Sequence, residues 1–420
     1  MSAEPALGSP HHLLNRLERA RPRWIARHPA AAWLAVGTVC VGAFLGQLTA
    51  SIVAAALPQL ATDLHAGRGA VTLASLSYLV TLAVLVGPAG AWSDVLGRKA
   101  LYVAGFAVFA VASLACALAP DLPVLCAFRV VQAVGAALLQ ANSVALIAGS
   151  VPRDRLGRAL GLQATAQAAG LAAGPALGGL LLTLGSWRLL FAATVPLGAI
   201  GLLTGFLLLP RSRDLATGVP VPLRRSPLLR EQTIRRALLL GFAGWVLLFG
   251  ALVEVPFWLT ATHRTTAPRA ALLLTGLPIG VALAASRSGR FAHHRPARLA
   301  VVGLLVAAAS AGVLALRPVP VVLVGVLVLL GAGLGVLNPA TTMIVMARVP
   351  APMAGSASGL LNLTRALGTA VGTALVAGAG GIAHDADGAL RLVAAALCLT
   401  AVAAATLARG PAGRGGRMGD

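Results

Sequence analysis

Long, uninterrupted apolar runs constrain this chain more than any other feature. Twelve runs of 20 or more residues are almost free of charged side chains. A helix needs about 20 apolar residues to cross a bilayer, and in lipid every backbone N–H and C=O must be satisfied within the protein. The runs do not alternate with period two, so we predict helices rather than a barrel. The predicted spans are 31–57, 70–92, 99–119, 122–149, 160–184, 188–210, 237–260, 268–287, 297–316, 319–346, 354–379 and 389–408.

The composition supports the same fold class. Hydrophobic residues make up 58% of the 420 residues and charged residues only 11%, whereas a soluble domain has roughly half apolar and about a quarter charged residues. A single globule cannot bury this excess of apolar surface, so lipid is the natural solvent. We therefore predict an all-α integral membrane protein.

The basic residues lie mostly on one side of the predicted membrane. Both termini and the joints after the even-numbered spans carry 25 of the 33 lysines and arginines, and the opposite joints carry six. Basic loops stay in the cytoplasm. We therefore expect a multi-pass protein of the cell (plasma) membrane with both termini cytoplasmic. This placement explains the formal net charge of +21 by contact with membrane lipids, without a nucleic-acid partner.

The longest joint divides the chain into two sets of six spans. It is basic and contains three prolines, which is typical of a cytoplasmic linker between two repeats. Two unrelated bundles in one chain are the alternative. The predicted parts are a basic segment at 1–30, a first six-helix bundle at 31–210, the linker at 211–236, a second bundle at 237–408 and a tail at 409–420.

The joint after the second span reads GAWSDVLGRK over residues 90–99. We expect Gly90 to permit a close helix approach and Asp94 to cap a helix or pair with a cation. Gly97 suits a tight turn, and Arg98 and Lys99 would anchor to anionic headgroups. The joint has the residues of a gating loop.

The fifth span carries small residues at helical spacing, namely Gly170, Gly174, Pro175, Gly178 and Gly179. Glycines four apart form a groove for a neighbouring helix, and a proline bends a span. An ordinary packing face is the alternative to a specific functional motif.

Together these motifs resemble the major facilitator superfamily. Residues 90–99 resemble its G-x-x-x-D-R-x-G-R-K signature, with Val95 in place of the usual arginine, and the fifth span resembles its antiporter motif, which is associated with export. Residues 129–135 are similar to its R-x-x-Q-G-x-G motif. Leu57-Pro58 at the end of the first span and residues 355–368 resemble the drug:proton antiporter branch. The resemblance implies a monomeric exporter of small organic molecules, drug- or antibiotic-like, that exchanges its substrate for protons by alternating access.

Proton coupling needs a titratable group, and the usual one is missing. The branch places an aspartate in the first span where this chain has Thr49, and a threonine does not release a proton near neutral pH. Glu254 is the one acidic residue deep in a span, in the pseudo-symmetric seventh. We hypothesise that Glu254 takes over the proton, beside a cation such as Arg129 or Arg365. The alternative is that Glu254 only neutralises an arginine or reaches the outer interface.

The predicted substrate cavity rests on polar and aromatic side chains within spans. Arg129 is costly in lipid unless it faces a wet cavity or a partner; snorkelling to the outer interface is the alternative. Each of the other candidates could equally link two helices. These candidates are Gln47, Thr49, Gln132, Gln140, Asn142, Gln163, Gln167, Trp245, Asn338 and Asn362.

Other classes of function fit less well. The eight histidines lie in loops, tails or span ends, including His293 and His294, and no phosphate-binding loop is present. We therefore expect no enzyme, no cofactor and no metal. A nutrient or metabolite uptake carrier, an uncoupled facilitator and a non-transporting receptor of the same fold remain the alternatives.

Overall fold

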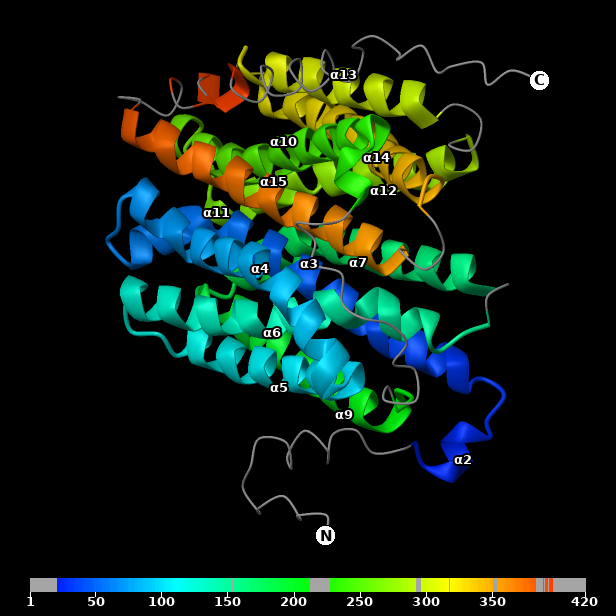
Figure 1. Cartoon of the computed structure of the whole chain (residues 1–420). Coiled ribbons are helices and arrows are strands. Elements are labelled where there is room, and N and C mark those ends of the chain that lie inside the picture. The colour runs from blue at the N-terminus through cyan, green and yellow to red at the C-terminus, as the bar shows by residue number, and fades with distance from the viewer. Residues whose placement is uncertain are drawn as a thin grey trace, which may run out of the picture.

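The computed structural model describes residues 21–152, 155–211, 227–291, 296–316, 318–349 and 354–382, with a few positions between 388 and 395. The described residues form helices joined by short turns (Figure 1). Eleven of their helical segments are long and apolar enough to cross a membrane, which confirms the predicted all-α membrane fold. The twelfth predicted span, 389–408, lies almost entirely outside the described residues.

Two neighbouring bundles run side by side, one made of α3–α9 and the other of α10–α15 (Figure 1). The first bundle contains α3 (Ala31–Asp63), α4 (Arg68–Leu96), α5 (Arg98–Ala117), α6 (Leu122–Ala148), α7 (Leu156–Leu182), α8 (Arg188–Ala192) and α9 (Thr194–Leu208). The second contains α10 (Gln232–Thr262), α11 (Ala267–Leu274), α12 (Gly276–Phe291), α13 (Pro296–Leu314), α14 (Pro320–Met346) and α15 (Ala354–Ile382). The short helices α2 (Arg23–Ala26) and η4 (Pro227–Arg230) precede α3 and α10.

The same close helix contacts recur in both bundles. A Cβ added at Gly135 in α6 would lie 2.8 Å from the carbonyl oxygen of Gly105 in α5, and one at Gly333 in α14 would lie 2.5 Å from that of Gly303 in α13. Such distances require glycine, because only its backbone tolerates this approach. Corresponding helices of the two bundles therefore pack in the same way, as expected for a repeat.

Prolines explain where the helices break. The sixth and eighth predicted spans each consist of two helices, with α8 ending at Ala192 and α11 at Leu274. Pro196 and Pro278 follow these two helix ends four residues later. A proline has no N–H, so neither can donate a hydrogen bond to the carbonyl oxygen of Ala192 or Leu274. By contrast, the prediction that Leu57-Pro58 ends the first span is wrong, because α3 continues to Asp63 with Pro58 inside it. Neighbouring helices compensate for a proline within a membrane helix.

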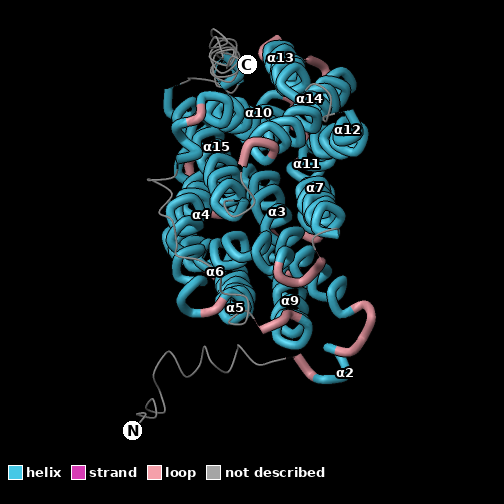
Figure 2. The backbone as a smooth tube through the Cα atoms, turned by 45° about the vertical axis from the view of Figure 1, so that its right-hand side comes forward, coloured by secondary structure: helices cyan, strands magenta, loops and turns pink. Residues whose placement is uncertain are grey.

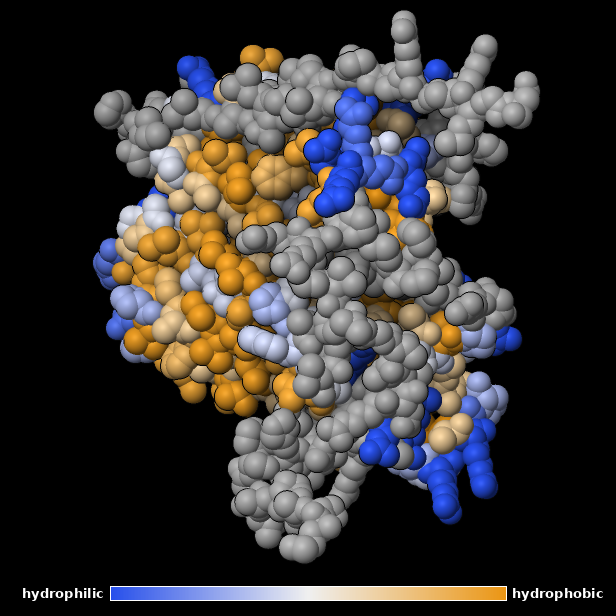
Figure 3. Space-filling model, in the orientation of Figure 1, coloured by the Kyte–Doolittle hydropathy of each residue, from blue (hydrophilic) through white to orange (hydrophobic). Residues whose placement is uncertain are grey.

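The helices α3 and α10 form the interior of the molecule. In their most apolar segments 72% and 89% of residues are buried, against 33% in the span that contains α9, and Figure 2 shows α3 surrounded by other helices. Apolar side chains also gather on the outer surface, as over the orange face of Figure 3, with hydrophilic residues toward the helix ends. This distribution suits a protein that is solvated by lipid.

We name the two ends of the molecule by their helix termini. The basic end is where α3 and α10 begin, and the far end is where α4 and α11 begin. Helix α4 packs against α15, and α7 packs against α11. A Cβ added at Gly179, near the far end of α7, would lie 2.9 Å from the carbonyl oxygen of Pro268 in α11. The two bundles therefore meet closely at the far end.

Candidate coupling and substrate site

Glu254 forms an ion pair between the two bundles. Its carboxylate accepts a hydrogen bond from the guanidinium of Arg68, the first residue of α4. Glu254 lies eight residues before the end of α10, which is about 12 Å at 1.5 Å per residue, and its side chain is 1% exposed. The Arg68 guanidinium also lies 4.8 Å from the ring centre of Phe257. The cation beside Glu254 is thus Arg68, which corrects the expectation of Arg129 or Arg365.

One oxygen of this carboxylate has no hydrogen-bond partner among the described residues. Glu254 Oε1 and Arg68 Nε are buried without a hydrogen bond within the described part of the chain. A buried, incompletely satisfied charge pair is costly. It is therefore a candidate for a group that changes its proton or its partner during function.

Arg68 is the site residue that sequence reasoning missed. It counts among the six arginines of the opposite joints, and nothing in its local sequence separates it from them. Its partner is 186 residues away, so no spacing pattern could reveal the pair. A useful signal would be an arginine at the start of the second span, directly after a first span that has Thr49 in place of the usual aspartate.

Arg129 belongs to a network inside the first bundle. Its Nε donates to the carbonyl oxygen of Ala74 at 2.9 Å, and its Nη1 donates to Gln132 Oε1 at 2.5 Å. Gln132 in turn donates to Ser113 at 2.7 Å. The Arg129 guanidinium lies 4.1 Å from the ring centre of Tyr78. Arg129 as a whole is 1% exposed. It does not snorkel to the interface but joins α4, α5 and α6.

Arg365 provides a second link between the bundles. From α15 it donates to Gln167 Oε1 on α7 at 3.0 Å, and its guanidinium lies 4.9 Å from the Trp245 ring centre. Trp245 stacks on Phe249 with ring centres 6.0 Å apart. Three predicted site residues, Arg365, Gln167 and Trp245, are therefore brought together near the middle of their helices.

The remaining cavity candidates are distributed over several helices. Gln163 donates to Ser143 at 2.9 Å, which makes it a link between α7 and α6. Thr49 Oγ1 and Asn142 Oδ1 are buried without a hydrogen bond among the described residues. Gln47 is buried on α3. The other three are partly buried, namely Gln140 on α6, Asn338 on α14 and Asn362 on α15.

The gating loop differs in part from its prediction. Gly97 has φ of 97°, in the left-handed region that glycine favours, so it forms the expected turn. Gly90 does not permit a close approach, because a Cβ there would meet nothing within 4 Å. Lys99 does not reach headgroups but is buried and donates to the Leu209 carbonyl oxygen at 2.9 Å. Arg98 is half-buried, and the Asp94 side chain lies outside the described residues.

The antiporter-motif helix packs closely on α3. A Cβ at Gly170 would collide with the backbone of Phe44, and one at Gly174 with Ser51 and, at 2.9 Å, the backbone nitrogen of Ile52. Gly178 faces Ile52 at 3.3 Å. Pro175 lies within α7. Together with the contact of Gly179 on α11, these glycines place α7 between the first bundle and the second.

No group of three or more His, Cys, Asp or Glu side chains is placed to hold a metal ion among the described residues. His293 and His294 lie outside them.

Two bundles of membrane helices with repeated contacts, joined by a buried ion pair and an arginine–glutamine hydrogen bond, define a secondary transporter rather than an enzyme. The family model of the Major Facilitator Superfamily matches residues 39–373. The chain therefore belongs to the major facilitator superfamily.

The relatives of this chain include an exporter. The chain is 28% identical to the tetracenomycin C resistance and export protein of Streptomyces glaucescens, over 84% of this chain and 78% of the relative. It is also 28% identical to the riboflavin transporter RibZ of Clostridioides difficile, over 43% and 39% of the two chains. Its fold is similar to that of a bacterial homologue of the human lysosomal transporter Spinster in an inward-facing, occupied conformation. That match has a TM-score of 0.70, 18% identity and coverage of 91% and 97%.

Proposed function

We propose that this protein exports small, drug-like organic molecules across the cell membrane in exchange for protons. The observation that carries the proposal is the buried Glu254–Arg68 pair between the bundles at the far end. The relation to an antibiotic resistance and export protein over most of both chains supports the direction.

In this proposal the basic end faces the cytoplasm. Arg235, Arg236, Arg298 and Arg348 all lie at that end, at or near the beginnings of α10 and α13 and the end of α14. Positive residues are retained on the cytoplasmic side. The far end, where the two bundles meet, then faces outward, and the structure represents a state closed to the exterior.

Glu254 is the proposed proton carrier. With the far end closed, its carboxylate is ionised and paired with Arg68. Opening of the far end separates α10 from α4 and would leave a charged carboxylate among apolar side chains, which is costly. A proton from outside removes that charge. Closing, followed by release of the proton toward the cytoplasm, restores the pair.

The substrate site is proposed at the centre of the molecule. Arg365, Gln167 and Trp245 offer a cation, an amide and an aromatic face at the junction of the bundles. Transporters of this architecture bind their substrates at the repeat interface near the midplane. This set favours neutral or anionic molecules with an aromatic portion over polycations.

A susceptibility panel tests the function. Cells that express the protein are compared with cells that lack it for growth in a set of antibiotics that includes tetracenomycin C. We expect higher tolerance and lower intracellular accumulation of at least one compound with the wild-type protein only. Equal accumulation for every compound would contradict export.

Uptake is the second candidate function, because a riboflavin transporter is among the relatives. Vesicles turned inside out distinguish the two. An exporter accumulates its substrate in them when their interior is acidified, whereas a proton-coupled uptake carrier drives substrate out.

A further inference from the structure

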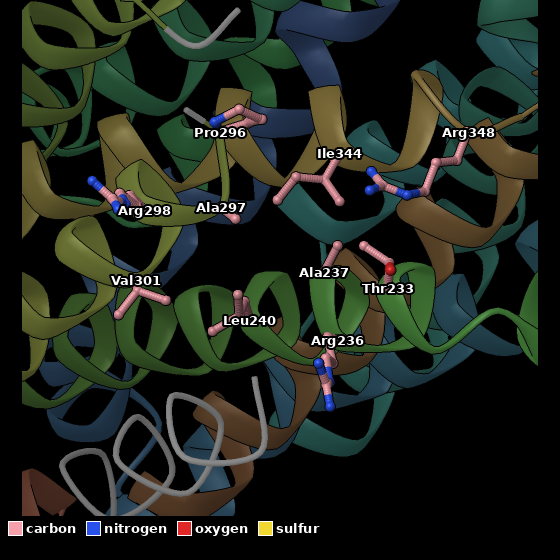
Figure 4. Close-up of a pocket in the computed structure, with 10 residues that line it drawn as sticks. All are labelled: Thr233, Arg236, Ala237, Leu240, Pro296, Ala297, Arg298, Val301, Ile344 and Arg348. Atoms are coloured by element: carbon pink, nitrogen blue, oxygen red, sulfur yellow. The ribbon is translucent and has the colours of Figure 1, made fainter. Parts of the chain in front are cut away.

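A cavity of about 590 Å³ opens at the basic end of the second bundle, between α10, α13 and α14. Its lining combines apolar and cationic side chains. Figure 4 shows Leu240 and Ile344 between Arg298 on one side and Arg348 on the other, with Val301 on the side of Arg298. Arg236 contributes a third guanidinium to the lining. The candidate substrate site between the bundles contains none of these residues.

The charges around this cavity are poorly compensated. Arg348 pairs with Glu231 at 3.1 Å. The guanidinium groups of Arg236 and Arg298 make no hydrogen bond or ion pair within the described part of the chain. An unpaired guanidinium group has planar N–H donors and can bind a phosphate through two parallel hydrogen bonds, in bidentate geometry. The cavity thus has the donors for a phosphate group and an apolar floor beneath it.

Exposed apolar side chains are sequence neighbours of two of the residues that line the cavity. Beside Leu240, Leu239 is 41% exposed on α10, and beside Val301, Val302 is 54% exposed on α13. A ligand that fits this arrangement has a negative headgroup at the membrane surface and acyl chains along the helices. A soluble anion would use the arginines but not the apolar walls.

We propose that this cavity binds the headgroup of an anionic phospholipid through Arg236, Arg298 and Arg348. The inner-leaflet location of that lipid rests on the proposed orientation of the basic end, but binding itself does not. A lipid bound in this cavity would contact both α10, which carries Glu254, and α13.

Native mass spectrometry of the detergent-purified protein tests the proposal. The protein is titrated with phosphatidylglycerol, with phosphatidylcholine and with phosphatidylglycerol plus inorganic phosphate. Each arginine near an anionic lipid contributes about a factor of five to binding. We therefore expect Arg236→Gln/Arg298→Gln to bind phosphatidylglycerol roughly 30-fold more weakly than wild type, with phosphatidylcholine binding unchanged.

Arg235→Gln is the matched control, because Arg235 neighbours Arg236 on α10 but does not line the cavity. It should retain wild-type binding. If the double variant aggregates, Arg298→Gln alone, on an exposed residue, should weaken binding about five-fold. Equal binding by wild type and these variants, an equal loss in Arg235→Gln, or displacement of the lipid by phosphate would overturn the proposal. This experiment measures lipid binding and not transport. Its result can therefore be interpreted even if the export assay fails.

Discussion

At the scale of single residues, the buried charges of this protein serve different purposes. Arg129 has a carbonyl, an amide and an aromatic face as partners within one bundle, which is typical of a structural link. Glu254 and Arg68 belong to different bundles, and each keeps an atom that has no hydrogen bond to the described residues. A pair of that kind can separate when the bundles move.

Gln132 offers a test of the structural role of Arg129. Gln132→Leu removes the acceptor of a buried guanidinium and should lower the free energy of unfolding by roughly 1–3 kcal/mol. Gln132→Glu keeps an acceptor at the same place, and the Ser113 hydroxyl can turn to donate to it, so stability should stay near wild type. Thermal unfolding in detergent measures both. If both variants lose stability equally, Arg129 does not depend on this partner.

The sequence predicts the buried residues better than it predicts their partners. The need for a partner follows from the cost of an arginine or a glutamate in lipid, so Arg129, Arg365 and Glu254 are found from position alone. The partner is a property of the tertiary fold. Gln167 is 198 residues from Arg365, and Lys99 is satisfied by a carbonyl 110 residues away.

At the scale of helices, close glycine contacts attach α7 to α3 and α15 to α10. A Cβ at Gly368 would lie 2.7 Å from the Phe242 carbonyl oxygen, which is the second-bundle equivalent of the contact between Gly170 and Phe44. We expect helices of one bundle that touch through backbone atoms to move as one unit. We expect each bundle to keep these contacts while the bundles rotate against each other.

Gly174→Leu tests this rigid attachment. The new side chain would collide with Ser51 and Ile52 on α3, and overpacking of this kind costs about 1–3 kcal/mol. We expect lower thermal stability and loss of substrate flux while membrane insertion persists. Gly161→Leu on the same helix is the control, because a Cβ at Gly161 meets nothing within 4 Å. Unchanged flux in Gly174→Leu would mean that this contact is dispensable.

Helix boundaries show where sequence patterns are insufficient. Apolar length locates every described span, but Pro58 lies inside α3, whereas Pro196 and Pro278 each follow a break. Nothing in the linear pattern distinguishes the three prolines. Similarly, Gly90 matches a packing motif but faces open space.

At the scale of the whole molecule, charge placement fixes the expected orientation. A reporter active only in the cytoplasm, fused after Asp420, should be active, and one fused within 264–266, between α10 and α11, should not. The asymmetry of basic residues drives this orientation. A silent reporter after Asp420 would contradict both the topology and the proposal that the structure is closed to the exterior.

Proton coupling by Glu254 is the step on which the proposed exchange of substrate for protons depends most. The direct measurement is substrate-induced proton movement in proteoliposomes, using a compound that the susceptibility panel identifies. Glu231→Gln is the matched control, because Glu231 is also paired with an arginine, at the beginning of the same helix. We predict that wild type and Glu231→Gln move protons when substrate is added, and that Glu254→Gln does not. Normal proton movement by Glu254→Gln would contradict the account and place the coupling residue elsewhere.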